Sequence, residues 1–131
     1  MNVFQKLKAT LRLREAVKKA TEAHEKTGER FYVMPASQNN CKLLIMDRYN
    51  FRKFKQKGYI SRKASVRDLE IESFYFTPYR NGSGEIHPVV IDLKRNQYME
   101  WYDNCLKEQK RKRKEKRKCK KEKKNKTSTE S

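Results

Sequence analysis

Two short apolar stretches flank a polar turn in residues 30–46, which read RFYVMPASQNNCKLLIM. The first stretch contains Phe, Tyr and Val, which favour β-strands, and Pro35 is expected to end it because proline provides no ladder donor. Residues 36–40 are polar, and residues 42–46 form the second apolar stretch. The pattern predicts a β-hairpin over residues 31–46 with a loop of five or six residues.

A helical pattern precedes this hairpin. Residues 3–27 carry apolar side chains at helical spacing, and Gly28 is well placed to end the helix in the left-handed conformation. Lys and Arg fill the other faces of this helix. Its expected buried stripe consists of Phe4, Leu7, Leu11 and Ala20 or Ala23, with Leu13 and Val17 beside it.

Three further helices are expected after the hairpin. Asp47 is a good N-cap for a short helix over residues 48–57, and Ser65 for another over residues 66–75. Pro88 suits the first turn of a final helix that runs into the lysine-rich tail without a sharp end. The apolar residues of that helix lie on two neighbouring faces, one with Val90, Leu93 and Trp101 and one with Ile91, Tyr98, Tyr102 and Cys105.

The last part of the chain carries more than half of the excess positive charge. Residues 105–131 contain 14 Lys and Arg against 4 Asp and Glu, a net +10 out of +18 for the 131-residue chain. A block of this kind repels itself and has nothing apolar to bury, so it is expected to be disordered or a frayed helix extension. It can neutralise a polyanion and release that polyanion's counterions, which makes nucleic acid the leading partner.

The fold class predicted from these patterns is α+β. A small domain over residues 1–106 contains an N-terminal helix, a β-hairpin, short helices and a C-terminal helix, and residues 107–131 form a disordered lysine-rich tail. The longest apolar run, residues 43–46, is far too short to cross a bilayer.

Residues 48–57, RYNFRKFKQK, combine basic and aromatic side chains. On a helix, Phe51 and Phe54 share one side and are expected in the core, while the basic residues cover a broad opposite side. That side either contacts phosphates or is a solvated face, and Tyr49 or Tyr59 is available to stack on an unpaired base. The residues expected to contact nucleic acid are Arg48, Tyr49, Arg52, Lys53, Lys55, Lys57, Tyr59, Lys110, Arg111, Lys112, Arg113, Lys114, Lys116, Arg117, Lys118, Lys120 and Lys121.

Catalytic, metal and cofactor chemistry is not indicated. His24 and His87 have no neighbouring pattern typical of a triad or metal site, and the acidic residues are scattered rather than clustered. The three cysteines are widely spaced and no CxxC occurs, so neither a disulfide framework nor a zinc site is expected. A reducing, cytoplasmic compartment fits this cysteine usage.

Four segments of the chain are distinctive as strings: GERFYVMP at residues 28–35, LLIMDRYNFRKFKQKGYI at 43–60, VRDLEIESFYFTPYRNG at 66–82 and KRNQYMEWY at 94–102. The chain resembles, over residues 3–104, a group of small basic proteins of microviruses, the single-stranded DNA phages and prophages of gut Bacteroidetes. The resemblance implies a phage setting, in the host cytoplasm, in which DNA replication or packaging would suit the charge.

The function expected from the sequence is non-catalytic binding of nucleic acid, with DNA favoured and single strands possible, mainly through backbone phosphates. The alternative is a phage structural or host-interaction protein that acts through protein–protein contacts. In that case, the aromatic set Tyr98, Trp101 and Tyr102 would form the contact surface. The basic N-terminal helix could also lie on an anionic membrane surface, but packing onto the domain is the favoured interpretation.

Overall fold

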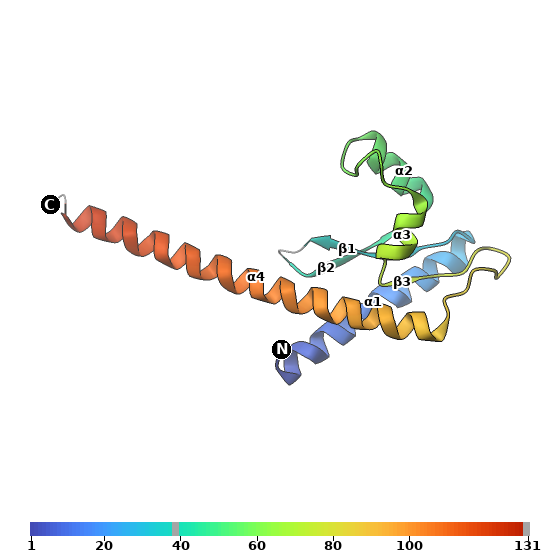
Figure 1. The fold of residues 1–131 in the computed structure, drawn as a ribbon, viewed down its shortest axis with the longest axis horizontal. Helices are drawn as coiled ribbons and strands as arrows, with labels where there is room; N and C mark the ends of the chain where they lie inside the picture. Colours follow the sequence, from blue (N-terminus) through green and yellow to red (C-terminus); the bar gives the residue numbers. More distant parts are fainter. Residues whose placement is uncertain (38–39, 130–131) are drawn as a thin grey trace.

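The computed structural model describes residues 1–37 and 40–129, with side chains for residues 1–36 and 40–123. It has the predicted α+β architecture, with a small antiparallel sheet between helices and a C-terminal helix that projects far from the domain (Figure 1). The elements are α1 (Val3–Thr27), β1 (Tyr32–Ser37), β2 (Lys42–Met46), α2 (Arg48–Gln56), α3 (Val66–Glu72), β3 (Tyr75–Phe76) and α4 (Pro88–Thr129).

The predicted hairpin is confirmed, and it forms two strands of a three-stranded sheet with the order β2-β1-β3. β1 pairs with β2 from Tyr32 opposite Met46 to Ser37 opposite Lys42, with an irregularity after Pro35. The prediction that Pro35 ends the first strand is wrong. β3 pairs only with Tyr32 and Val33, so Pro35 lies beyond the end of β3, where its missing N–H disrupts little pairing. Residues 38 and 39 of the predicted loop lie outside the described residues.

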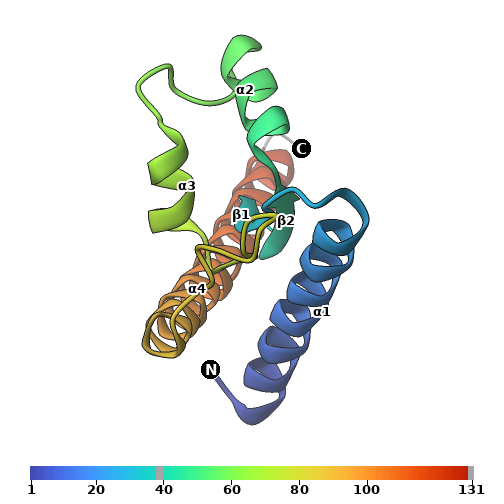
Figure 2. The ribbon, with the colours of Figure 1, turned by 90° about the vertical axis from the view of Figure 1, so that its right-hand side faces the viewer.

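The two faces of the sheet are buried by different helices. Tyr32, Met46 and Phe76 face α2 and α3 and pack with Phe51 and Leu69 from those helices. On the other face, α1 covers the sheet, and Figure 2 shows α1 and α3 on opposite sides of the strands. The first turns of α4 contribute Val90 and Ile91 to the face of α2 and α3. The alternation of side chains along β1 therefore supplies two small cores, as a pleated strand requires.

The helix predicted over residues 3–27 is confirmed, but its predicted buried stripe is wrong in part. The buried residues are Ala9, Ala16 and Ala20, and these small side chains let α1 lie close to the sheet and α4. The large residues Phe4, Leu7 and Leu11 are exposed, Phe4 by 82%. The apolar spacing predicted the helix correctly but not the face that it buries. The face that packs against the domain is the neighbouring one, which carries the alanines and Leu13.

The helix predicted over residues 66–75 ends early. Ser65 caps it as predicted, and its backbone N–H bonds to Asp68 at 2.7 Å, but α3 stops at Glu72. Tyr75, which was predicted as helical, instead forms β3 with Phe76 and pairs with β1. The buried Lys94 ammonium stabilises this ending, because it donates to the carbonyl oxygens of Glu70, Ile71 and Ser73 at 2.7, 3.3 and 2.6 Å.

A single helix, α4, runs for 42 residues from the predicted start at Pro88. Tyr98, Tyr102 and Cys105 are buried with Ala9, Cys41 and Phe74, so the second of the two predicted faces enters the core. Leu93, from the other predicted face, is exposed. The helix continues through the basic segment from 107 to 129, as in the predicted alternative of a helix extension, because Lys, Arg and Glu are good helix formers and the preceding packed turns nucleate the helix. Residues 130–131 of the predicted tail lie outside the described residues.

Candidate nucleic-acid interface

α2 presents part of the predicted basic face. Asp47 caps the helix as predicted, with its carboxylate accepting from the Asn50 N–H at 2.8 Å. Phe51 is buried and anchors the opposite side of the helix in the core. Arg52, Lys53 and Lys57 are exposed. The structure therefore places three predicted cations on an outward helix face, where they can reach the phosphates of a strand.

The two tyrosines predicted to stack on bases are both exposed. Tyr49 is exposed by 64% and Tyr59 by 77%. The Lys53 ammonium lies 4.7 Å from the centroid of the Tyr49 ring, and Tyr59 packs edge-on against Phe54 with centroids 6.1 Å apart. Both rings keep exposed surface, and Tyr49 has a cationic side chain beside it, which is the combination that single-strand binding sites use.

Two predicted contact residues of this region have structural partners instead. Lys55 donates to the carbonyl oxygen of Ala64, and its ammonium lies 5.6 Å from the Phe51 ring centroid. It therefore fastens the segment after α2 to the helix. Arg48 donates to the Tyr79 hydroxyl at 2.8 Å and belongs to a separate cluster described below.

The basic extension, defined as residues 107–129 of α4, contains the other predicted contact residues. Every side chain from 110 to 123 is exposed. At about 1.5 Å per residue, the extension is roughly 34 Å long. Arg111 pairs with Glu108 and Glu115 across one helical turn, at 3.1 and 3.3 Å, so it is partly neutralised. The Lys and Arg side chains surround the helix rather than forming a single stripe.

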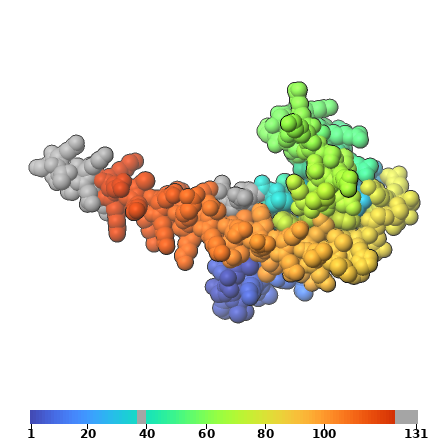
Figure 3. Space-filling model, viewed as in Figure 1, coloured from blue at the N-terminus to red at the C-terminus, as the bar shows by residue number. Residues whose placement is uncertain are grey.

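The basic extension and the face of α2 are well separated in space. In Figure 3 the extension projects to the left, away from the domain, whereas α2 stands on the upper side of the domain. The structure thus brings the predicted contact residues together as two groups, one on α2 and one on the extension. It does not join them into one surface in this view.

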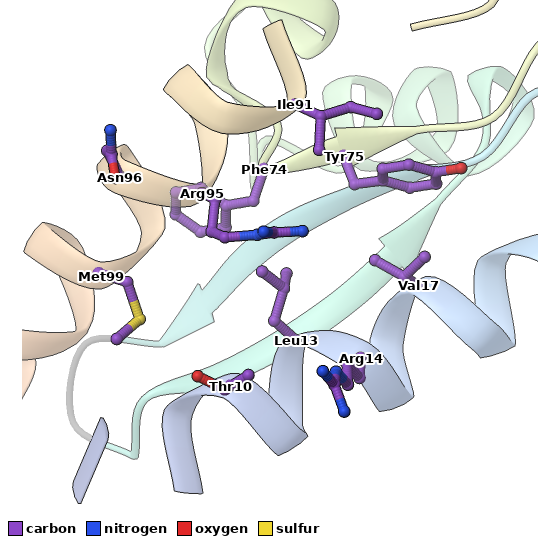
Figure 4. Close-up of a pocket in the computed structure, with 10 residues that line it drawn as sticks. All are labelled: Thr10, Leu13, Arg14, Val17, Phe74, Tyr75, Ile91, Arg95, Asn96 and Met99. Carbon is purple, nitrogen blue, oxygen red and sulfur yellow. The ribbon is translucent and has the colours of Figure 1, made fainter. Parts of the chain in front are cut away.

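A hollow of about 470 Å³ lies between α1 and α4 and was not anticipated from the sequence (Figure 4). Its lining is mainly apolar and includes Leu13, Phe74 and Met99, while Arg14 and Arg95 come from the two helices that flank it. The apolar lining is unsuited to phosphate. The hollow exists because α1 and α4 diverge from their contact near Ala9 and Tyr98, where the Tyr98 hydroxyl donates to the Ala9 carbonyl at 2.7 Å.

A cluster of three arginines around Tyr79 was also missed by sequence reasoning. It lines a depression of about 390 Å³ formed by Gly28, Glu29, Arg30, Arg48, Tyr79, Arg80 and Asn81. Arg30 follows α1, Arg48 begins α2 and Arg80 follows β3, so only the tertiary fold brings them together. The sequence signal was limited to arginine and tyrosine at the ends of elements, which is too common to identify a site.

The aromatic set predicted for a protein-contact surface lies largely in the core. Tyr98 and Tyr102 are buried, and Trp101 packs against Phe74 with ring centroids 5.4 Å apart. That part of the alternative prediction is wrong. The rings face inward because residues 98, 102 and 105 lie on the side of α4 that meets α1 and Phe74.

Within the described part of the chain, no group of three or more His, Cys, Asp or Glu is placed to hold a metal ion. No helix in the same residues is long and apolar enough to span a membrane. No protein-family model matches the chain, and no curated protein or solved structure shows significant similarity to it.

Proposed function

We propose that the protein binds nucleic acid, with DNA favoured, mainly through backbone phosphates and without catalysing a reaction. One observation carries this proposal above the others: from residue 110 to residue 123 the basic extension presents exposed Lys and Arg side chains around a helix that projects from the domain. A helix with this surface repels itself, and a polyanion relieves that repulsion while its counterions are released.

The two basic groups have different roles in this proposal. The extension captures nucleic acid, because its charges project from the domain and lysine contacts phosphate as a point charge without reading bases. The α2 face, with Arg52, Lys53 and Lys57, fixes the domain on the strand. The exposed rings of Tyr49 and Tyr59 stack on unpaired bases, which gives a preference for single strands.

The resemblance to microvirus proteins supports a biological setting for this activity. In that setting the protein would act in the host cytoplasm, on phage DNA during replication or packaging. The setting depends on the resemblance alone, and the binding proposal does not require it.

The capture role is tested in the full chain with five Lys→Gln substitutions in the extension, at Lys114, Lys116, Lys118, Lys120 and Lys121. Glutamine preserves helix propensity while it removes charge. If these residues contact phosphates, the slope of log affinity against log salt concentration for duplex DNA becomes shallower by about 4 to 5, near 0.9 for each lost contact. Fluorescence anisotropy between 50 and 300 mM salt measures the slope.

A matched control makes the same change in charge on α1, with Lys→Gln at Lys6, Lys8, Lys18, Lys19 and Lys26. All five are exposed. The proposal expects a much smaller change in slope for this variant than for the extension variant. Equal changes would show that net charge alone drives binding. If both variants bind as tightly as the unaltered protein at every salt concentration, the extension has no capture role.

The single-strand preference has its own test in the double variant Tyr49→Ala and Tyr59→Ala. Base stacking contributes about 1–3 kcal/mol per base, so binding to a single strand should weaken by at least tenfold while duplex binding changes little. Anisotropy with a single strand and a duplex of equal length measures both. Equal losses on the two substrates would contradict stacking.

A further inference from the structure

The depression around Tyr79 gathers three guanidinium groups with few carboxylates near them. Glu29 is the one acidic residue in its lining, and it lies 3.9 Å from Arg80. Arg30 reaches the carboxylate of Glu70 only at 4.0 Å. Three guanidinium groups against these two carboxylates leave the depression with a net positive charge, which favours an anionic ligand.

Arg30 is held in a fixed position within this site by the side chains packed around it. It is only 4% exposed, and its guanidinium carbon lies 4.2 Å from the Phe76 ring centroid and 4.4 Å from that of Tyr79. Stacking between two rings holds the cation rigidly. Its buried Nε has no hydrogen-bond partner within the described residues, so the charge is fixed but not fully satisfied.

Arg48 and Arg80 complete the cluster from opposite elements. Arg48 donates to the Tyr79 hydroxyl and lies 5.0 Å from the centroid of that ring, so Tyr79 contacts the guanidinium groups of both Arg30 and Arg48. Arg80 donates one Nη2 bond to the Thr27 carbonyl at the end of α1, at 2.8 Å. That bond orients the guanidinium, and its remaining N–H groups are available to a ligand.

Two glycines allow this arrangement. Gly28 has φ +74°, and a Cβ there would lie 2.5 Å from Arg80 Nε, so the guanidinium can lie over the end of α1 only because Gly28 has no side chain. Gly84 has φ +71°, and a Cβ there would lie 2.8 Å from the Tyr79 ring and 3.1 Å from Arg30 Nη1. The loop itself is closed by the Tyr79 N–H, which donates to the Ser83 carbonyl at 2.9 Å.

We propose that this arginine pocket binds a phosphate monoester dianion, and that its ligand is the terminal phosphate of a nucleic-acid strand. A monoester offers three unesterified oxygens and about two negative charges, which matches several forked guanidinium donors better than a backbone diester does. The identification of the ligand as the end of a nucleic-acid strand rests on the proposed function. The binding of a phosphate monoester by the pocket is independent of the proposed function.

The test compares three oligonucleotides of one sequence, carrying a 5′-phosphate, a 3′-phosphate or hydroxyls at both ends, bound to the full-length protein at constant ionic strength. The strand with the preferred terminal phosphate should bind on the order of tenfold more tightly than the hydroxyl strand, as expected for new charge-assisted hydrogen bonds. The 5′ and 3′ arms identify which end the pocket accepts.

Arg80→Gln should bring the ratio between phosphorylated and hydroxyl strands close to one and leave hydroxyl-strand binding within about twofold, because the extension still captures the strand. Arg67→Gln, an exposed arginine on α3, is the matched control and should leave the ratio unchanged. A ratio of one in the unaltered protein, together with salt-dependent binding of all three strands, would overturn the terminal phosphate as the ligand and leave the proposed function intact.

A second measurement tests the pocket without nucleic acid. Inorganic phosphate is titrated against chloride at matched ionic strength, and the arginine side-chain N–H signals are followed by NMR. Shifts concentrated at Arg30, Arg48 and Arg80 support the pocket even if no strand binds. Uniform shifts among the arginines would overturn the pocket. The absence of shifts up to about 50 mM phosphate would also overturn it, because several charge-assisted bonds should bind phosphate more tightly than that.

Discussion

The two halves of α4 share one helix but are stabilised in different ways. Residues 88–106 bury Tyr98, Tyr102 and Cys105 against α1, Cys41 and Phe74. Residues 107–129 leave the domain after Gln109, whose amide donates to Cys41 Sγ at 3.6 Å. Beyond that contact the helix depends on the propensity of Lys, Arg and Glu and on local ion pairs such as that of Arg111 with Glu115. The same secondary structure therefore has tertiary support in one half and only local support in the other.

This difference indicates how a chain can combine a stable domain with a responsive arm. The packed half holds its geometry at any ionic strength at which the domain folds. The extended half is weakened by its own repulsion, so its helix content should depend on salt and on bound polyanion.

Tyr98→Ala should have the largest effect, a loss of about 3–5 kcal/mol in the free energy of unfolding, because it removes a buried ring and its bond to the Ala9 carbonyl. Lys114→Ala, in the extended half, should change it by no more than about 0.5 kcal/mol. Urea denaturation followed by Trp101 fluorescence measures both. Comparable losses would show that the extension contributes to the core after all.

Cys105 and Cys119 report the same contrast through their reactivity. Burial, together with the neighbouring Cys41, raises the pKa of Cys105 to about 12, whereas Cys119 is exposed. Iodoacetamide at pH 8 should alkylate Cys119 about 1,000-fold faster than Cys105, since the thiolate is the reactive form. Peptide mapping after timed quenching measures the two rates, which should converge in denaturant. Rapid labelling of Cys105 in the native protein would mean that this part of α4 opens readily.

The raised pKa of Cys105 also has a consequence for stability. The unfolded thiol loses its proton above about pH 8.5, while the folded thiol keeps it until the pH approaches 12. Between these values the folded state binds more protons, so the free energy of unfolding falls as pH rises. Cys105→Ala should reduce this alkaline loss, and urea denaturation at pH 8 and pH 10 would detect it. An unchanged pH dependence would contradict the assignment to Cys105.

Lys94→Met should cost about 1–3 kcal/mol in the free energy of unfolding, because three carbonyl groups at the end of α3 lose their donor. Methionine keeps most of the apolar stem, and Lys110→Met in the exposed half is the control, with little expected change.

Burial lowers the pKa of Lys94, so the unfolded state binds more protons just below the ordinary value of about 10.4. Stability of the unaltered protein should therefore rise with pH there, relative to Lys94→Met. If the stability of the unaltered protein relative to Lys94→Met falls as pH rises, the lowered pKa of Lys94 is contradicted.

Arg111→Gln should have the smallest effect and leave global stability unchanged. It removes the ion pairs with Glu108 and Glu115, so the helix content of residues 108–118 should fall slightly at low salt. Backbone Cα chemical shifts measure this local helicity, and the difference from the unaltered protein should vanish in 1 M salt. A loss that persists at high salt would indicate that something other than ion pairing supports the extension.

Features set by neighbouring residues could be predicted from the sequence. Asp47 and Ser65 cap their helices, Gly28 ends α1 with a positive φ, and Pro88 starts α4, each through contacts within a few residues. The exposed tyrosines and basic residues of α2 were likewise located by local pattern.

Features that depend on distant residues were missed. The buried face of α1 was misassigned because alanines, not the larger Leu and Phe side chains, fit against the sheet. β3 consists of two residues whose strand geometry is imposed by pairing with β1. The arginine pocket joins Arg30, Arg48 and Arg80 from three elements, and spacing along the chain carries no signal for that.

The length of the basic extension determines how strongly its outer charges interact with the rest of the protein. The Debye length is about 8 Å at 0.15 M salt and about 30 Å at 0.01 M, against roughly 34 Å for the extension. In physiological salt the outer charges and the α2 face are therefore screened from one another and meet a strand as independent sites. In dilute buffer the two merge into one polycation, and only there should mutations on one perturb binding through the other.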